Sequence, residues 1–256
     1  MTEKATPSPF YHFLVGAARN CGLSALLHPL EVIKLKKQSE CSQKRNYLIA
    51  TDIFRQEGIK GFYKGLWPQL AKTTLNALAW TIIPDSAHFL KDREIHPLHK
   101  AALKGVVISF FQAAALNPLE KTKVTSITQD RKFSFGPFLK EGWKGSGANF
   151  LNLSAKWSSF LVSRKYFSDK MRKEGELTPF QLVDIGVRTA CIVSVVSAPT
   201  DVWKTWRLSD VKFSELFSKK FLRNMYRGWT LSATASLVST IVTVAVLEEL
   251  QKSSDS

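Results

Sequence analysis

The chain has 256 residues, of which 45% are hydrophobic, and it carries a formal net charge of +15. This charge suits an anionic membrane or a nucleic acid as partner, although the mean hydropathy of −0.08 is low for a membrane protein. The three cysteines, Cys21, Cys41 and Cys191, have no metal-ligand spacing and exclude a disulfide framework. The N-terminus resembles neither a secretory signal nor an Arg-rich transit peptide, so we expect any targeting information to be internal.

Six long helices are predicted along the chain, in three pairs. The first helix of each pair spans about 10–38, 99–127 and 179–207, and the second spans about 66–93, 146–172 and 229–252. At 1.5 Å per residue these lengths reach across a bilayer core of about 30 Å. The last helix has no charge between Gly228 and Leu247, whereas the other five are interrupted by Arg19, Lys72, Lys104, Lys156 and Arg188. A charge at membrane depth is costly, so we expect each to face a water-filled cavity or a partner.

One motif, a proline followed by an acid two residues later and a lysine three residues after that, occurs in the first helix of every pair. Its copies are Pro29, Glu31 and Lys34; Pro118, Glu120 and Lys123; and Pro199, Asp201 and Lys204. Thirteen residues before each proline stands a glycine, Gly16, Gly105 or Gly186, as in close helix packing. We therefore predict three repeats, at about 10–93, 99–172 and 179–252, within one transmembrane domain that covers 1–256.

Two observations favour a membrane protein over a soluble helical bundle. A proline inside a soluble helix costs about 3 kcal/mol, whereas a kinked membrane helix regains its bonds from neighbours. Lys and Arg also gather in 36–65, 121–145 and 204–228, as expected for connections on one side of a membrane.

The chain resembles a divergent, shortened member of the mitochondrial carrier family. The likeness is most specific in the first repeat, where Lys36 and Gln38 extend the proline motif and Glu57, Gly58 and Gly61 precede an aromatic-base-glycine triplet. The resemblance implies an all-α membrane protein in which six transmembrane helices surround a central cavity with threefold pseudo-symmetry. It also implies a monomer in the mitochondrial inner membrane, of a host cell if the chain is microbial, that moves one solute by alternating access.

The proline motifs supply a predicted matrix-side gate. By the resemblance, the three acids and three lysines form a ring of inter-helix ion pairs that closes the cavity toward the matrix: Glu31, Lys34, Glu120, Lys123, Asp201 and Lys204. Exposed pairs of this kind contribute about 0–1 kcal/mol each, which suits a gate that must open. Gln38 is expected to brace one pair, while Ile127 and Leu208 occupy the equivalent positions. The alternative is ordinary i,i+3 pairing on solvated helix faces.

The opposite, cytosolic gate is expected to be weak. The positions that the family uses hold Asp85 with His88, Lys165 with Ser168, and Glu248 with Gln251. Lys165 has two candidate partners, Asp85 and Glu248, but a symmetric ring cannot form. The alternative is that this end is a solvated helix terminus.

The substrate site is placed by the resemblance one to two turns deeper on the second helices. Its candidate residues are Lys72, Thr73, Asn76, Asn152, Leu153, Lys156, Ala235, Ser236 and Ser239. We expect two ammonium groups, Lys72 and Lys156, to face the cavity with no carboxylate at their level, which favours an anion, with a nucleotide as the first specific candidate. The alternative is that either lysine snorkels or pairs structurally.

Three aromatic-base-glycine triplets open the second helices, and they are expected to bind lipid. They are Tyr63, Lys64 and Gly65; Trp143, Lys144 and Gly145; and Tyr226, Arg227 and Gly228. Free backbone N–H groups beside a base and an interfacial aromatic suit an anionic head group. The resemblance implies cardiolipin, and the alternative is an interfacial anchor.

The connections between proline and triplet are shorter in repeats two and three, so their matrix-side helices must be trimmed. The five histidines have neither metal nor triad spacing, so we predict no enzyme and no cofactor. Two other functions stay open, a membrane protein of the same fold that does not transport and a basic helical nucleic-acid binder, although the chain has no known nucleic-acid motif.

Overall fold

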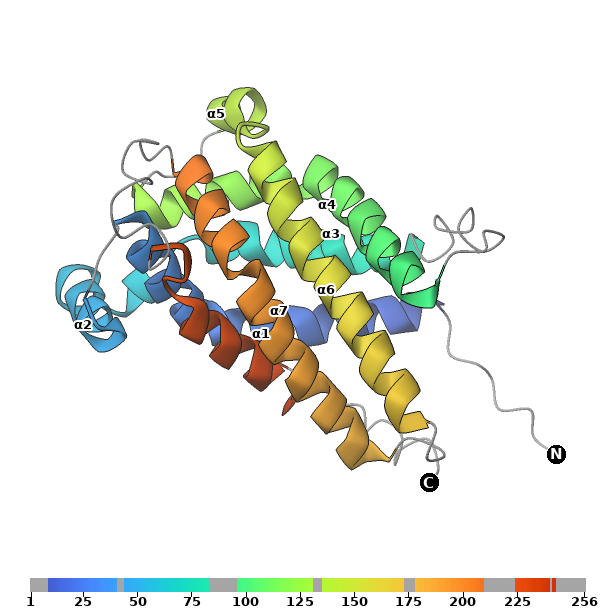
Figure 1. Cartoon of the computed structure of the whole chain (residues 1–256). Helices are drawn as coiled ribbons and strands as arrows, with labels where there is room; N and C mark the ends of the chain where they lie inside the picture. The colour runs from blue at the N-terminus through green and yellow to red at the C-terminus, as the bar shows by residue number, and fades with distance from the viewer. Residues whose placement is uncertain are drawn as a thin grey trace.

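The computed structural model describes residues 9–40, 44–82, 96–130, 135–172, 178–209, 224–239 and 241–242, and its described elements are all helical. Figure 1 shows a bundle of long helices with two short ones at its edge. In chain order the elements are α1 (Pro9–Ser39), α2 (Asn46–Glu57), the 3-10 helix η1 (Ile59–Tyr63), α3 (Leu66–Ile82), α4 (Pro97–Thr128), α5 (Phe135–Glu141), α6 (Ser146–Arg172) and α7 (Pro179–Leu208). Residues 229–239 form a further helix.

The observed helices agree closely with the predicted ones. α1, α4 and α7 each contain the motif proline within one continuous helix, and α6 has the predicted bounds. The ends of two predicted helices, 83–93 and 243–252, lie outside the described residues. Helix α5, which takes the place of the predicted matrix-side helix of repeat two, has 7 residues where α2 has 12, and this confirms the trimming in that repeat.

Two described helices, Pro97–Thr128 and the part of α7 from Phe180 to Leu208, are long and apolar enough to cross a membrane. α1 and α6 have sufficient length but carry more charged residues, among them Arg19 and Lys156. Charged side chains that line an internal cavity lower the hydropathy of a helix without touching lipid. The arrangement of six spans therefore remains a prediction.

Neighbouring helices pack along α1 and α3, α3 and α4, α4 and α6, and α6 and α7. Helices α4 and α6 approach closely at Gly105, where an added Cβ would lie 2.5 Å from the backbone nitrogen of Ser158. This confirms the expected role of Gly105 in helix packing. The same expectation is wrong at Gly16, since a Cβ there would meet none of the described atoms within 4 Å.

The glycines of the three triplets connect successive repeats. Gly65, Gly145 and Gly228 all have φ between +72° and +85°, a left-handed conformation that favours glycine. A Cβ would lie 3.2 Å from Ile127 of α4 at Gly65, 2.9 Å from Leu208 of α7 at Gly145, and 3.7 Å from Gln38 of α1 at Gly228. Each repeat thus packs its triplet on the proline-motif helix of the next, and the third packs on the first.

An apolar cluster fills the end of the bundle near α2. It contains Val32, Ile33, Leu35, Ile49, Ile53, Val124, Ile127, Leu208 and Leu231. Because these residues come from α1, α2, α4, α7 and the helix at 229–239, the cluster holds the motif helices together at this end. The helix turns that carry the motif acids and lysines adjoin it.

Candidate functional site

The acids and lysines of the three proline motifs meet in a closed ring of ion pairs. Lys123 Nζ lies 2.7 Å from Glu31 Oε1, and Lys204 Nζ lies 2.8 Å from Glu120 Oε1. Lys34 pairs with Asp201 and closes the circle. Each pair joins helices of different repeats, so the structure has the inter-helix contacts that the motif predicts.

Most of the ring is buried, which differs from the weak, exposed pairs expected from the sequence, although the Glu31 side chain is 30% exposed. Lys123 is 1% exposed and Asp201 is 2% exposed. Within each helix Lys123 also lies 3.1 Å from Glu120, and Lys204 lies 3.5 Å from Asp201. A buried pair gains little net stability, but removing one partner leaves an uncompensated charge and costs about 3–5 kcal/mol. The ring is therefore more sensitive to substitution than an exposed pair would be.

Gln38 lies one helical turn beyond Lys34 and is buried with Thr205 of α7. Its Oε1 accepts a hydrogen bond of 2.8 Å from Thr205 Oγ1, and its Nε2 donates to the carbonyl oxygen of Arg227 at 3.0 Å. The expected brace thus joins helices beside the Lys34–Asp201 pair through a hydroxyl and a carbonyl. Ile127 and Leu208, at the equivalent positions, are buried in the apolar cluster.

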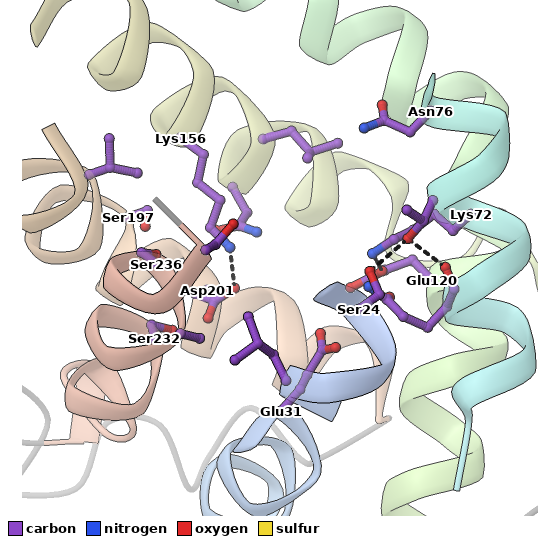
Figure 2. Close-up of a pocket in the computed structure, with 18 of the residues that line it drawn as sticks. Ser24, Glu31, Lys72, Asn76, Glu120, Lys156, Ser197, Asp201, Ser232 and Ser236 are labelled. Atoms are coloured by element: carbon purple, nitrogen blue, oxygen red, sulfur yellow. Dashed lines mark hydrogen bonds and ion pairs between the residues drawn. The ribbon is translucent and has the colours of Figure 1, made fainter. Parts of the chain in front are cut away.

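A cavity of about 930 Å³ opens above the ring, and all nine predicted substrate residues line it. Lys72, Thr73 and Asn76 come from α3, and Asn152, Leu153 and Lys156 come from α6. Ala235, Ser236 and Ser239 come from the helix at 229–239. Figure 2 shows Lys72 and Lys156 reaching into the cavity from opposite walls. The ring residues Glu31, Glu120 and Asp201 form its floor.

Both cavity lysines are paired with acids of the ring, contrary to the expectation that no carboxylate lies at their level. Lys72 Nζ lies 2.6 Å from Glu120 Oε2, and Lys156 Nζ lies 3.1 Å from Asp201 Oδ1 (Figure 2). The expectation was wrong because it considered only which residues stand at the same level along the helices. The four methylenes of a lysine side chain let each ammonium reach the proline-motif helix of the next repeat. Glu120 and Asp201 thereby each contact three ammonium groups.

Comparison with known proteins identifies the fold family. The family described as Mitochondrial carrier protein matches residues 5–93. The human mitochondrial 2-oxodicarboxylate carrier is 29% identical over 205 residues, which cover 70% of this chain and 68% of the relative, and the Bos taurus protein is 28% identical over 216 residues, covering 75% and 72%. The mitochondrial aspartate-glutamate transporter of Saccharomyces cerevisiae is 30% identical over 122 residues, covering 44% and 13%. The chain belongs to the mitochondrial carrier family. The named relatives are mitochondrial carriers, and members of this family are transporters rather than enzymes.

Most of the predicted cytosolic gate of this carrier lies outside the described residues: Asp85, His88, Glu248 and Gln251. Lys165 is described, and its ammonium lies 3.0 Å from Asp169 one turn along α6. The pairing of Lys165 with Asp85 or Glu248 stays a prediction.

Two charges of the carrier had not been assigned to the solute site from the sequence, Arg19 and Arg164. Both line the cavity, and no acid pairs with either of them within the described part of the chain. By contrast, Arg188 pairs with Asp184 at 2.9 Å. Lys104 is exposed and does not line the cavity, so the expectation that every helix-interrupting charge faces a cavity or a partner fails there. Lys104 is only eight residues into α4, near the helix end, where a long side chain can reach water.

The residues that precede two of the motif prolines were also missed. The His28 ring nitrogen Nε2 lies 2.7 Å from the carbonyl oxygen of Lys64, and Asn117 Nδ2 donates to the carbonyl oxygen of Gly142 at 2.6 Å. Each bond ties a proline helix to the triplet region of its own repeat. Both residues stand directly before a motif proline, and this position is the sequence signal that could have identified them.

The triplets present aromatic side chains outward, but their bases differ. Tyr63, Trp143 and Tyr226 are exposed, whereas Arg227 is buried. Lys64 pairs with Asp130 and, at 2.9 Å, with Glu57. Although partial burial opposes it, hydrogen bonding to Lys36 and Lys64 holds the pKa of Glu57 below its usual value. A lipid phosphate would have to compete with these carboxylates for Lys64.

Proposed function

We propose that this carrier moves a small dicarboxylate across the mitochondrial inner membrane through one central site with alternating access. The observation that carries the proposal is the pair of ammonium groups, Lys72 and Lys156, on opposite walls of the cavity. Two cations facing each other across a site match an anion with a charge at each end. The proposal includes six membrane-spanning helices with threefold pseudo-symmetry and a monomeric carrier.

The relatives favour a dicarboxylate over the nucleotide that ranked first from the sequence. Two of them are named for 2-oxodicarboxylates and for aspartate and glutamate, which all carry two carboxylates. Thr73, Asn152 and the serines of the helix at 229–239 add neutral hydrogen-bonding groups to the cavity wall. A nucleotide stays the second candidate, because the cavity of about 930 Å³ is roomy and Trp157 and Phe160 supply aromatic surface.

The two lysines also connect binding to the gate. In the closed ring, Lys72 holds Glu120 and Lys156 holds Asp201. A substrate whose carboxylates take both ammonium groups leaves each acid with one cation fewer, which lowers the stability of the closed ring relative to the open one. A ligand shifts such an equilibrium only through its different affinity for the two states. Here the substrate favours the open state because its two carboxylates replace Glu120 and Asp201 as the partners of Lys72 and Lys156.

We place a weak gate at one end of the carrier and lipid sites at the other. Lys165, Asp85 and Glu248 form a weak cytosolic gate, so the carrier rests with its cavity open to the cytosol. Cardiolipin binds at the triplets, and the exposed Tyr63, Trp143 and Tyr226 lie at the membrane interface.

Uptake into liposomes tests the proposed function. We expect the reconstituted carrier to exchange radiolabelled 2-oxoglutarate at least about 10-fold faster than a five-carbon monocarboxylate, because loss of one charged hydrogen bond costs about 1.5–3 kcal/mol. Nucleotides are measured alongside. Faster nucleotide than dicarboxylate flux would favour the second candidate. No flux with any solute, from protein that inserts normally, would indicate a fold that no longer transports, and solubility without detergent with salt-sensitive nucleic-acid binding would contradict the membrane assignment.

A further inference from the structure

Three side chains from three helices form a hydrogen-bonded chain in the cavity wall. Trp157 Nε1 on α6 donates to Gln112 Oε1 on α4 at 2.6 Å. Gln112 Nε2 donates in turn to Asn76 Oδ1 on α3 at 2.5 Å. All three residues line the cavity, and Gln112 is 5% exposed.

The direction of this chain follows from the chemistry of its first member. The indole nitrogen of Trp157 is only a donor, so the group of Gln112 that faces it must be the carbonyl oxygen. The amide NH2 of Gln112 then faces Asn76 and requires an acceptor there, which is Asn76 Oδ1. Turning the Asn76 amide over would set two donors against each other and leave the nearly buried Gln112 NH2 without a partner, which is costly. Trp157 therefore fixes the orientation of Asn76 through Gln112.

With Oδ1 engaged, the remaining polar group of Asn76 is its NH2. Among the described residues no hydrogen bond uses Asn76 Nδ2. Asn76 lies one helical turn beyond Lys72 on α3, and Figure 2 shows its amide extending into the cavity above Lys72. An anion held by Lys72 would find a fixed donor beside it.

We propose that Trp157 and Gln112 are positioning residues that hold Asn76 as a hydrogen-bond donor and so select a dicarboxylate that carries a 2-oxo group. This inference rests on the proposed function. An oxo group can only accept a hydrogen bond, and Asn76 Nδ2 donates to it while the carboxylates contact the lysines. A dicarboxylate without the oxo group leaves the Asn76 NH2 without this partner.

The test compares 2-oxoglutarate with glutarate on the full-length carrier, by uptake into liposomes and by thermal stabilisation of the purified protein in detergent. A neutral hydrogen bond gives a preference of about 3- to 10-fold for 2-oxoglutarate in the wild type, from its typical net contribution. Trp157→Phe keeps the aromatic ring and loses the donor, and Gln112→Leu removes the middle of the chain. Both are expected to bring the ratio of the two affinities close to one. Asn76→Asp removes the final donor and gives the same loss of preference.

Ser159→Ala is the matched control on α6, since within the described residues the Ser159 hydroxyl bonds only to the carbonyl oxygens of Ala155 and Lys156 in its own helix. Its ratio is expected to equal that of the wild type.

The inference is wrong if the wild type binds both compounds equally, or if Trp157→Phe and Gln112→Leu weaken both equally with the ratio unchanged. That second result would show that the chain only holds α3, α4 and α6 together. If 2-oxoglutarate stabilises the protein more than glutarate does but neither enters liposomes, the transport proposal fails and the selective site stands. If neither compound enters or stabilises the protein, both proposals are overturned.

Discussion

Replacing Lys72 and Lys156 together by glutamine is expected to reduce dicarboxylate uptake to the level of protein-free liposomes. Each single substitution is expected to lower uptake by at least about 30-fold, because loss of one partner of a desolvated charge pair costs about 2–5 kcal/mol. Stability should change much less. Glu120 keeps Lys123 and Lys204 when Lys72 is removed, and Asp201 keeps Lys34 and Lys204 when Lys156 is removed.

Initial uptake rates and melting curves of the same preparations measure the two effects separately. Lys104→Gln is the matched control, because it removes the same charge from an exposed position away from the cavity. Uptake by the double variant at more than about a tenth of the wild-type rate would show that the two lysines do not bind the substrate. A melting temperature that falls in parallel with uptake would make their role structural.

Substitution of Asp201 by asparagine is expected to have the largest effect on stability. Its carboxylate is 2% exposed and contacts Lys34, Lys156 and Lys204. Removing the negative charge leaves Lys34 and Lys156 without their ring partner, at a cost of about 3–5 kcal/mol. For a protein of this size that corresponds to a decrease in Tm of about 10 °C.

Asp184→Asn is the control for this prediction, since Asp184 also pairs within α7, with Arg188, but both side chains are partly exposed. Such a pair contributes about 0.3–0.5 kcal/mol, so its Tm should change little. The double variant Asp201→Asn with Lys156→Gln removes one of the repelling cations and is expected to be more stable than Asp201→Asn alone. Equal Tm changes for Asp201→Asn and Asp184→Asn would contradict the buried ring.

The motif spacing in the sequence was sufficient to predict the ring, because each acid and lysine lies at the same place in a repeated helix. Three equal units that pack on one another in a circle leave one arrangement in which Glu31 meets Lys123, Glu120 meets Lys204, and Asp201 meets Lys34. The nine predicted substrate residues line the cavity for the same reason. Their positions follow from their distance along the chain from the repeated motifs.

What the sequence could not show depends on distances between helices that differ from one repeat to another. Lys72 and Lys156 stand at different levels of their helices, and yet both reach an acid of the next repeat. The hydrogen-bonded chain from Trp157 to Asn76 joins residues that have no counterpart in the motif. Lys64 was predicted as a lipid ligand from its triplet, but its contacts with Glu57 and Asp130 depend on how the chain folds around η1.

The central claim is that a substrate bound to Lys72 and Lys156 opens the ring, and the reactivity of a cysteine beneath the ring tests it most directly. Ile127 is 1% exposed and lies one turn beyond Lys123, in the apolar cluster. We would place Ile127→Cys in a background with Cys21, Cys41 and Cys191 changed to serine, and measure its reaction with a membrane-impermeant thiol reagent. The account predicts that 2-oxoglutarate accelerates this reaction, and that it does not when Lys72 and Lys156 are glutamine. A transporting carrier whose cysteine reacts at the same rate with and without 2-oxoglutarate would contradict the account.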